Sequence, residues 1–274
     1  MASQPEFLDV AGVTIAVRRR PGRSPGLVWL GGYRSDMLGT KAQALDEWAA
    51  RTGHACLRHD YSGHGESGGR FEDGTISRWL EESLAVFRRH APERAILVGS
   101  SMGAWIALRM VQELRNAGEG DRVAGLILLA PAPDFTIELM EPQLTQAQKQ
   151  EIEEKGYFSE PSDYSDEPNI YTKALVEDGR RNRVLQGIIE TGCPVHILQG
   201  MADPDVPYAL AEKLLRHVPV CDVTTASRAR RISISSCARS RAWSRWPAEE
   251  TSCVSPSPPR PSSRRSSASA VRWR

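Results

Sequence analysis

Gly99-Ser100-Ser101-Met102-Gly103 is the stretch around which this 274-residue chain is arranged. It follows an apolar run, residues 95–98, that is typical of a fully buried strand. It precedes residues 104–114, whose apolar side chains recur at helical spacing. Strand, Gly-x-Ser-x-Gly and helix is the order of a nucleophile elbow, in which small residues let the backbone turn sharply and present the serine hydroxyl. We therefore expect Ser101 to be a nucleophile; the alternative is a glycine- and serine-rich loop without chemistry.

Apolar runs on both sides of this motif indicate an α/β fold. Residues 27–30 and 123–129 are apolar without alternation, and helical patterns separate the runs, which predicts a mostly parallel, doubly wound sheet covered on both faces. Residues 134–190 interrupt the alternation of strands and helices with two weaker helical stretches, 144–155 and 171–185, joined by a polar linker. We interpret residues 134–190 as a helical cap over the carboxyl edge of the sheet.

A second loop is expected to complete an oxyanion hole. The run Gly31-Gly32-Tyr33-Arg34-Ser35-Asp36-Met37 follows a buried strand, and paired glycines at this place let a backbone N–H point inward. The N–H of Tyr33 would then join the N–H of Met102 in binding a developing oxyanion. The alternative is an ordinary turn between a strand and a helix.

The candidate acid follows a late strand, residues 193–199. Asp203 lies in the next turn, where a carboxylate would hold the catalytic histidine in the correct tautomer. Asp205 is the alternative acid, although its place before Val206-Pro207 suggests a role at the start of a helix. A third possibility is that both residues only cap the helix expected over residues 208–217.

One histidine is a candidate catalytic base but is expected to be structural. His64 lies in a glycine-rich turn, residues 59–68, and a histidine in such a tight loop more often bonds the backbone than acts as a base. We therefore do not assign it as the catalytic histidine.

Together these pieces resemble the α/β-hydrolase fold, and within it the serine esterases and thioesterases. The resemblance covers about residues 5–220, and the motifs that carry it most strongly are Gly99-Ser100-Ser101-Met102-Gly103 and Gly200-Met201-Ala202-Asp203-Pro204-Asp205-Val206-Pro207. The Arg34-Ser35-Asp36-Met37 turn, followed by Gly39-Thr40-Lys41, is similar to the branch that contains a mitochondrial palmitoyl-protein thioesterase also able to cleave acyl glucuronides, and its bacterial relatives. The resemblance implies hydrolysis of carboxylic esters or thioesters without a cofactor.

The triad that this resemblance implies is incomplete. Its order is serine, acid, then a histidine on a loop after the last strand. Only His217 follows Asp203, at the end of the expected helix, and residues 218–274 contain no histidine. We therefore identify no triad histidine, and we expect a protein with the fold and site of an esterase but with low catalytic activity.

The composition changes where that histidine should be. Residues 222–274 contain 14 Ser and 11 Arg but no Leu, Gly, Lys, Phe or Tyr, so they are not expected to supply a final strand and helix. Their net charge is +8, against −7 for residues 1–221. One interpretation is a disordered basic tail for nucleic acid or an acidic partner. We prefer a reading-frame shift: Val223–Arg228, encoded as GTG ACC ACC GCA TCT CGC, gives Asp-His-Arg-Ile-Ser when read one base back.

The remaining expectations follow from composition. Residues 1–133 and 191–221 form the core, 134–190 the cap and 222–274 the basic tail. With 40% hydrophobic and 25% charged residues, no apolar signal core and no span, a cytoplasmic protein is expected. The five scattered cysteines predict neither a metal nor a cofactor, and the expected partner is a small or acylated substrate rather than nucleic acid. The alternative function is a non-catalytic hydrolase-like protein with a basic interaction tail.

Overall fold

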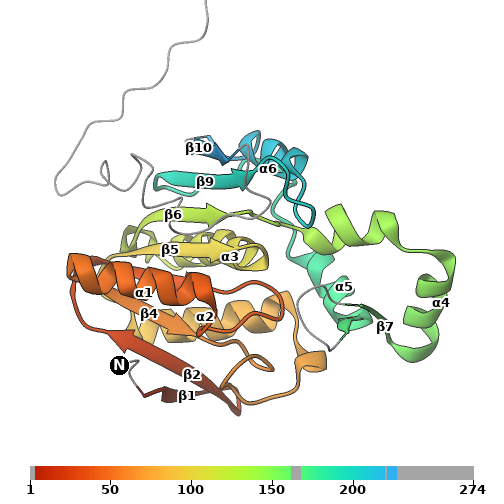
Figure 1. Cartoon of the computed structure of the whole chain (residues 1–274), viewed down its shortest axis with the longest axis horizontal. Coiled ribbons are helices and arrows are strands. Elements are labelled where there is room, and N and C mark those ends of the chain that lie inside the picture. Colours follow the sequence, from red (N-terminus) through yellow and green to blue (C-terminus); the bar gives the residue numbers. More distant parts are fainter. Residues whose placement is uncertain (1–3, 162–167, 220, 227–274) are drawn as a thin grey trace, which may run out of the picture.

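Eight strands form one mostly parallel sheet at the centre of the molecule (Figure 1). The structure, a computed structural model, describes residues 4–161, 168–219 and 221–226. The strand order is β1-β2-β4-β3-β5-β6-β9-β10; β2 pairs antiparallel with β1 and β4, and the other pairs are parallel. The strands are β1 (Glu6–Val10), β2 (Val13–Arg20), β3 (Arg23–Leu30), β4 (His54–His59), β5 (Ala95–Ser100), β6 (Val123–Leu129), β9 (Val195–Gly200) and β10 (Cys221–Ala226).

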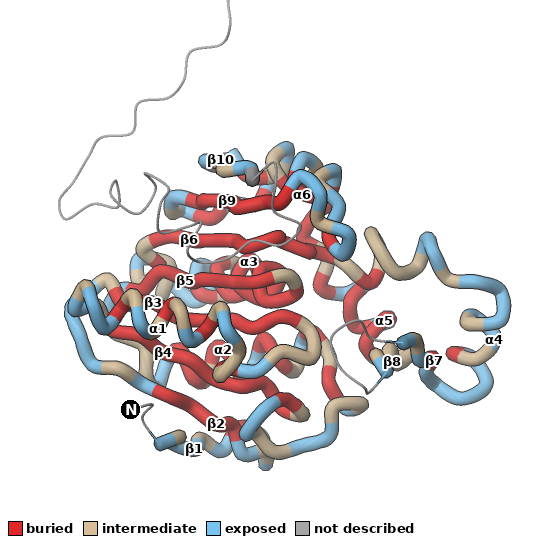
Figure 2. Tube along the Cα trace, in the orientation of Figure 1, coloured by how far each residue is buried: buried red, intermediate tan, exposed pale blue. Residues whose placement is uncertain are grey.

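Helices cover both faces of this sheet, as the unbroken apolar strands predict. Alternate side chains of one strand point to opposite faces, so Leu27 and Trp29 pack with α1 while Val28 and Leu30 pack with α2 and α3. The strands are accordingly buried along most of their length (Figure 2). The helices on the sheet are α1 (Thr40–Thr52), α2 (Ile76–His90), α3 (Met102–Asn116) and α6 (Tyr208–Leu215).

The ends of the first two helices follow from local sequence. Thr75 caps α2 by accepting a hydrogen bond from the Arg78 N–H, and Gly53 ends α1 in the left-handed conformation, φ 75°. At its other end, α1 begins at Thr40, and Gly39 is its N-cap without a side-chain hydrogen bond, because a glycine can also occupy this position.

The cap lies beyond the carboxyl ends of β5, β6 and β9, whose arrows point toward it (Figure 1). Its two helices are shorter than the expected stretches, and a two-stranded antiparallel hairpin replaces part of the linker. The elements are α4 (Gln146–Lys155), β7 (Tyr157–Glu160), β8 (Asn169–Thr172) and α5 (Lys173–Arg181). Short turns of helix lie at Phe71–Asp73, Gly120–Arg122, Thr136–Met140 and Glu141–Gln143.

Two buried carboxylates anchor the cap to the core. Asp134, where the chain enters the cap, accepts hydrogen bonds from the Val184 and Leu185 N–H groups, where the chain leaves it. Asp178 of α5 accepts hydrogen bonds from the N–H and the hydroxyl of Ser77, in the first turn of α2. The cap is therefore held at its base and against α2.

The sheet extends past the expected end of the core. β10 pairs in parallel with β9 as far as Ala226, so residues 222–226 belong to the sheet although no strand was expected beyond residue 221. This expectation was wrong because Val223, Thr224 and Thr225 are β-branched and favour strands, whatever the composition that follows. The rest of the expected tail, residues 227–274, lies outside the described residues.

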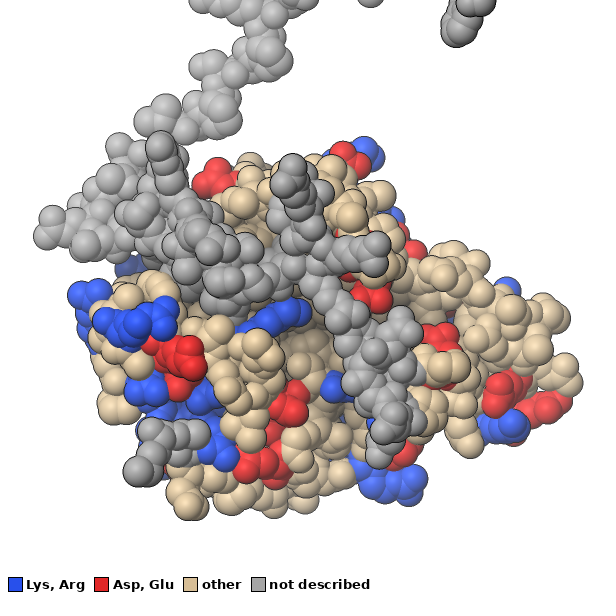
Figure 3. Space-filling view, in the orientation of Figure 1, with Lys and Arg blue, Asp and Glu red and all other residues tan. Residues whose placement is uncertain are grey.

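Charges of both signs lie next to each other on the side of the molecule where α1 lies (Figure 3). Asp46 of α1, for example, pairs with Arg20 at 2.7 Å and with Arg58 at 3.3 Å. These pairs tie α1 to β2 and β4. In the part of the chain that the structure describes, no helix combines the length and the apolar character needed to cross a membrane.

Candidate active site

Parallel pairing brings the loops that hold the expected site residues to one edge of the sheet. Leu30 of β3 pairs with Gly99 of β5, Ser100 pairs with Leu129 of β6, and Leu129 pairs with Leu198 of β9. The loops after β3, β5 and β9 therefore begin at the same edge of the sheet. Such an edge, at the carboxyl ends of parallel strands, is where ligands bind in open α/β sheets.

Ser101 forms the sharp turn between β5 and α3 that the motif predicts. Its φ of 54° and ψ of −118° lie in a region that non-glycine residues rarely adopt. The flanking glycines make this turn possible: a Cβ on Gly99 would come 2.5 Å from the Gly103 carbonyl oxygen, and a Cβ on Gly103 would come 2.1 Å from that of Leu30. Backbone strain of this kind gathers at functional sites, where the surrounding structure maintains it.

The loop after β3 lies against this turn. A Cβ on Gly32 would come 3.4 Å from the Cβ of Ser101, so no larger residue fits here without displacement. Within the described part of the chain, the N–H groups of Tyr33 and Met102 donate no hydrogen bond. These two expected oxyanion donors thus stand available beside the serine, and their role stays a prediction.

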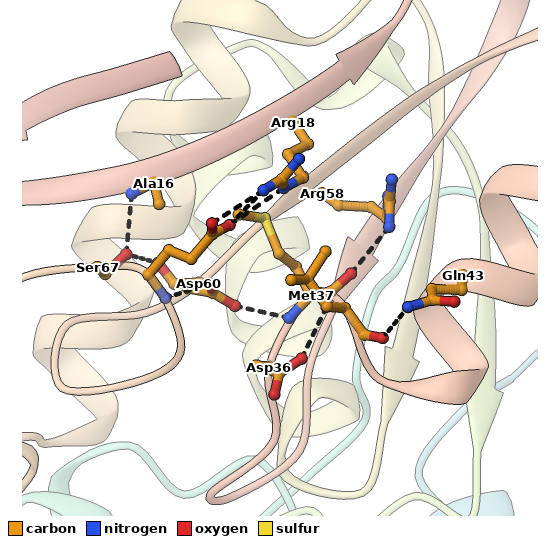
Figure 4. A network of polar contacts seen from close by, with 10 residues as sticks. Ala16, Arg18, Asp36, Met37, Gln43, Arg58, Asp60 and Ser67 are labelled. Carbon is orange, nitrogen blue, oxygen red and sulfur yellow. Dashed lines mark hydrogen bonds and ion pairs between the residues drawn. The ribbon is translucent and has the colours of Figure 1, made fainter. Parts of the chain in front are cut away.

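A buried carboxylate fixes the far end of the same loop (Figure 4). Asp60, which follows β4, accepts hydrogen bonds from the Met37 N–H at 2.6 Å and the Glu66 N–H at 2.8 Å. Arg58 donates to the Met37 carbonyl at 2.9 Å, so Met37 is held through both of its backbone groups. Burial raises the pKa of Asp60 to about 6.

His64 holds the middle of the loop and has the structural role that its glycine-rich turn predicts. The Arg34 N–H donates to Nε2 at 3.2 Å, so Nδ1 carries the proton and donates to the Ser62 carbonyl at 3.0 Å. Burial lowers the pKa of His64 to about 4, which keeps the ring neutral and able to accept from Arg34. His64 thus links the backbone of Arg34 to the backbone of Ser62 through its two ring nitrogens.

Asp203 follows β9 at the same edge, and a tight turn fixes its carboxylate. Its Oδ1 accepts hydrogen bonds from the N–H groups of Asp205 at 3.1 Å and Val206 at 3.0 Å. Its Oδ2 has no hydrogen bond to any described residue. Pro207, without a side-chain bond, is the N-cap of α6, so neither aspartate caps that helix. The choice of Asp203 over Asp205 as the acid stays a prediction.

No histidine joins Asp203 to Ser101 in the part of the chain that the structure describes. β6 separates β5 from β9, so the two loops begin roughly 10 Å apart and need a bridging imidazole. His217 bonds the Gly187 carbonyl at 2.8 Å, and His196 bonds Thr224 at 3.0 Å. Neither of these rings, nor any contact described for the other histidines, involves Ser101 or Asp203.

Sequence reasoning missed two groups of the site. Lys41, in the first turn of α1, reaches Ser100, the residue before Ser101, with its Nζ 3.3 Å from the Ser100 hydroxyl. Asp60 lies in the glycine-rich turn of residues 59–68, but its sequence context offers no reason to assign it a role. The signal for Lys41 was its place directly after the loop that approaches the serine, whereas nothing local reveals that Asp60 binds Met37.

Two further observations concern metal binding and a pocket outside this site. Among residues 4–161, 168–219 and 221–226, no group of three or more His, Cys, Asp or Glu side chains is placed to hold a metal ion. A pocket lined in part by Arg94, Asp121 and Pro194 lies at the opposite edge, where β6 and β9 begin. It is therefore separate from the site around Ser101.

Comparisons with known proteins match this geometry. The sequence model described as the alpha/beta hydrolase family matches residues 22–231. The human mitochondrial palmitoyl-protein thioesterase ABHD10 is 35% identical over 216 residues, which is 78% of this chain and 68% of the human protein. A crystal structure of a hydrolase from Agrobacterium vitis S4 is 55% identical with a TM-score of 0.78, over 82% of this chain and 90% of that one. Mouse alpha/beta hydrolase domain-containing protein 10 is 30% identical with a TM-score of 0.74, over 83% and 90%.

Proposed function

This chain belongs to the alpha/beta hydrolase family, and we propose that its site is that of a serine hydrolase for carboxylic esters or thioesters, with Ser101 as the nucleophile. The observation that carries the proposal is the strained turn at Ser101, φ 54°, with the Gly32 backbone against it. Strain at this one serine, beside two backbone N–H groups without partners in the described chain, fits acyl transfer better than a passive loop.

The proposed reaction proceeds through an acyl-enzyme. The Ser101 Oγ bonds to the acyl carbon, its proton passes to a base, and the carbonyl oxygen becomes an oxyanion stabilised by the N–H groups of Tyr33 and Met102. The bond to the leaving alcohol or thiol then breaks, and the leaving group takes up a proton from the base. Water next attacks the acyl carbon and loses a proton to the base. The base returns this proton to the Ser101 Oγ as the bond between Oγ and the acyl carbon breaks, which releases the acid and regenerates Ser101.

The group of this mechanism that the chain lacks is the base that accepts the Ser101 proton. We infer that the triad histidine is absent, because none of the six histidines of the sequence contacts Ser101 or Asp203 in the described chain. In a well-studied serine protease, loss of the histidine costs on the order of 10⁶ in kcat. Turnover by this chain is therefore expected to be slow.

The place of the missing group can be inferred from the sheet. Ala226, the last residue of β10, pairs with Gly200, the last residue of β9, so β10 ends beside the start of the loop that holds Asp203. In this fold the histidine follows the acid in the chain. A base gained or lost near codons 223–228 would remove it, and the test is to reread the gene there. If neither neighbouring frame encodes a histidine, the frame-shift proposal is wrong.

Turnover and chemical rescue test the catalytic proposal directly. We would measure hydrolysis of a p-nitrophenyl acyl ester and an acyl thioester by the whole chain, with and without added imidazole. We expect slow turnover that Ser101→Ala abolishes and that imidazole increases, because a free base can accept the Ser101 proton. Ser159→Ala, the same substitution at an exposed position of β7, is the matched control and should retain both rates.

Equal rates for the whole chain and Ser101→Ala, with and without imidazole, would contradict the proposal. The non-catalytic alternative would then be favoured.

A further inference from the structure

Tyr33 connects the nucleophile site to the cap. Its backbone follows Gly32, which lies against Ser101, whereas its side chain extends into the cap. The phenol hydroxyl donates a hydrogen bond to the Ile170 carbonyl of β8. The ring stacks on Tyr171 of the same strand, with centroids 5.2 Å apart and planes 5° from parallel. One residue therefore contacts both halves of the molecule.

The ring of Tyr33 also touches the segment where the chain enters the cap. Phe135 lies 5.8 Å away between centroids, and Phe71 of the core packs edge-on at 5.0 Å. Tyr33 is thus enclosed by the entering segment, the returning strand β8 and the core. Aromatic contacts of this kind are each worth a fraction of a kcal/mol to about 1.5 kcal/mol beyond burial, so several together restrict the ring.

The next residue, Arg34, makes a second link between the same two parts. Its Nη1 donates to the Pro168 carbonyl, just before β8, at 2.6 Å. Its backbone N–H donates to His64 of the core, and its φ of 54° is unusual for a non-glycine residue. The Tyr33–Arg34 peptide, which directly follows the Tyr33 N–H, is therefore held by His64 of the core, while the side chains of both residues bind carbonyl groups of the cap.

We propose that β8 of the cap positions the oxyanion donor, with Ile170 and Tyr171 acting through Tyr33 as positioning residues; this rests on the proposed function of Ser101. The core fixes the loop at Arg34 and Met37 and packs Phe71 and Trp79 edge-on against the Tyr33 ring. The cap provides the stacked Tyr171 ring and the hydrogen-bond acceptor for the Tyr33 hydroxyl. A cap that shifts, for instance as an acyl chain enters beneath it, moves the Tyr33 side chain and, through its Cα, the adjoining N–H. The alignment of the oxyanion hole is thereby coupled to the cap.

Hydrogen exchange tests this coupling without requiring activity. Tyr33→Phe removes only the hydroxyl that binds Ile170. We expect exchange in the peptide spanning residues 31–37 to rise roughly three- to tenfold, the range that one hydrogen bond contributes. Tyr157→Phe makes the same change at an exposed position of β7 and should leave that peptide unchanged. Protection of residues 95–100, in β5, reports that the fold is intact.

Tyr171 provides the second, independent variant. Tyr171→Ala removes the stacked ring and should raise exchange in residues 31–37, whereas Tyr171→Phe keeps the ring and should restore most of the protection. Exchange in 31–37 that stays at the wild-type level in both Tyr33→Phe and Tyr171→Ala would overturn the proposal, whatever happens in residues 168–172.

Kinetics with imidazole separates this proposal from the proposed function. An oxyanion donor acts on the transition state, so Tyr33→Phe and Tyr171→Ala should lower kcat about tenfold or more with little change in KM. A rise in KM alone would mean that these residues only line the acyl site, and would overturn the positioning role. If no Ser101-dependent turnover exists, the proposed function fails, and hydrogen exchange still decides whether the cap fixes the loop.

Discussion

Gly32 packs so close to Ser101 that an added methyl group would be in tight contact: a Cβ on Gly32 would come 3.4 Å from the Cβ of Ser101 and 3.3 Å from the Ser100 carbonyl oxygen. Gly103, on the other side of the serine, is packed more tightly still against the end of β3, where a Cβ would come 2.1 Å from the Leu30 carbonyl oxygen. The elbow and the loop after β3 are therefore one packed unit. The close packing of this unit depends on the absence of side chains at these glycines.

Gly103→Ala is expected to destabilise the fold by about 1–3 kcal/mol, because the new methyl group would overlap two carbonyl oxygens of a buried strand end. Urea unfolding followed by circular dichroism measures the change. Gly187→Ala is the matched control, since a Cβ there meets nothing within 4 Å. Equal stability of Gly103→Ala and the wild type would mean that the elbow is packed more loosely than described.

His64 should make the protein less stable in mild acid. Burial lowers its pKa to about 4, against about 6.5 in an unfolded chain, so between these values the unfolded chain binds a proton that the folded chain does not. Stability therefore falls as pH is lowered through this window, by an amount on the order of 2–3 kcal/mol. His64→Gln should flatten the dependence of the unfolding free energy on pH between pH 6.5 and 4.5. An unchanged slope would contradict a neutral, buried His64.

Asp60 should change the free energy of unfolding with pH in the direction opposite to His64, over a similar range of pH. Burial raises its pKa to about 6, so between pH 4 and 6 the folded chain binds a proton that the unfolded chain has released. The contribution of Asp60 to stability therefore decreases as pH rises through this window. Asp60→Asn should make stability rise more steeply with pH, while lowering it throughout because one N–H loses its acceptor. A flatter slope in this variant would contradict the assignment.

Local patterns were sufficient to predict the elements that form the site. The strand, turn and helix around Ser101, and the paired glycines before Tyr33, are each specified by residues close together in the sequence. Parallel pairing then brings these loops to one edge, because all such strands end on the same side. The position of the elbow and its neighbouring loop could therefore be predicted before the structure was known.

Features that depend on distant contacts could not be predicted. The β7–β8 hairpin lies in a polar stretch whose short strands are supported by packing on Tyr33, which is remote in sequence. The bond from Asp60 to Met37 spans 23 residues and leaves no periodic signal. β10 was missed for a different reason: its β-branched residues were averaged into the arginine- and serine-rich composition that follows.

The anchor between the cap and α2 provides a last test. Asp178 accepts hydrogen bonds from the Ser77 N–H at 2.7 Å and the Ser77 hydroxyl at 2.8 Å, although 101 residues separate them. The Asp178 carboxylate also lies at the N-terminal end of α2, where negative charge is favourable. Asp178→Ala should cost about 1–3 kcal/mol, because a buried N–H and a hydroxyl lose their acceptor.

The matched control for this anchor is Glu177→Ala, which removes the neighbouring carboxylate of α5 from an exposed position and should change stability by less than about 0.5 kcal/mol. Thermal unfolding measures both variants, and hydrogen exchange of the first turn of α2 locates the effect. If the two variants lose equal stability, the Asp178–Ser77 contact does not hold the cap. If Asp178→Ala alone increases exchange at Ser77, the cap is anchored to α2 through this carboxylate.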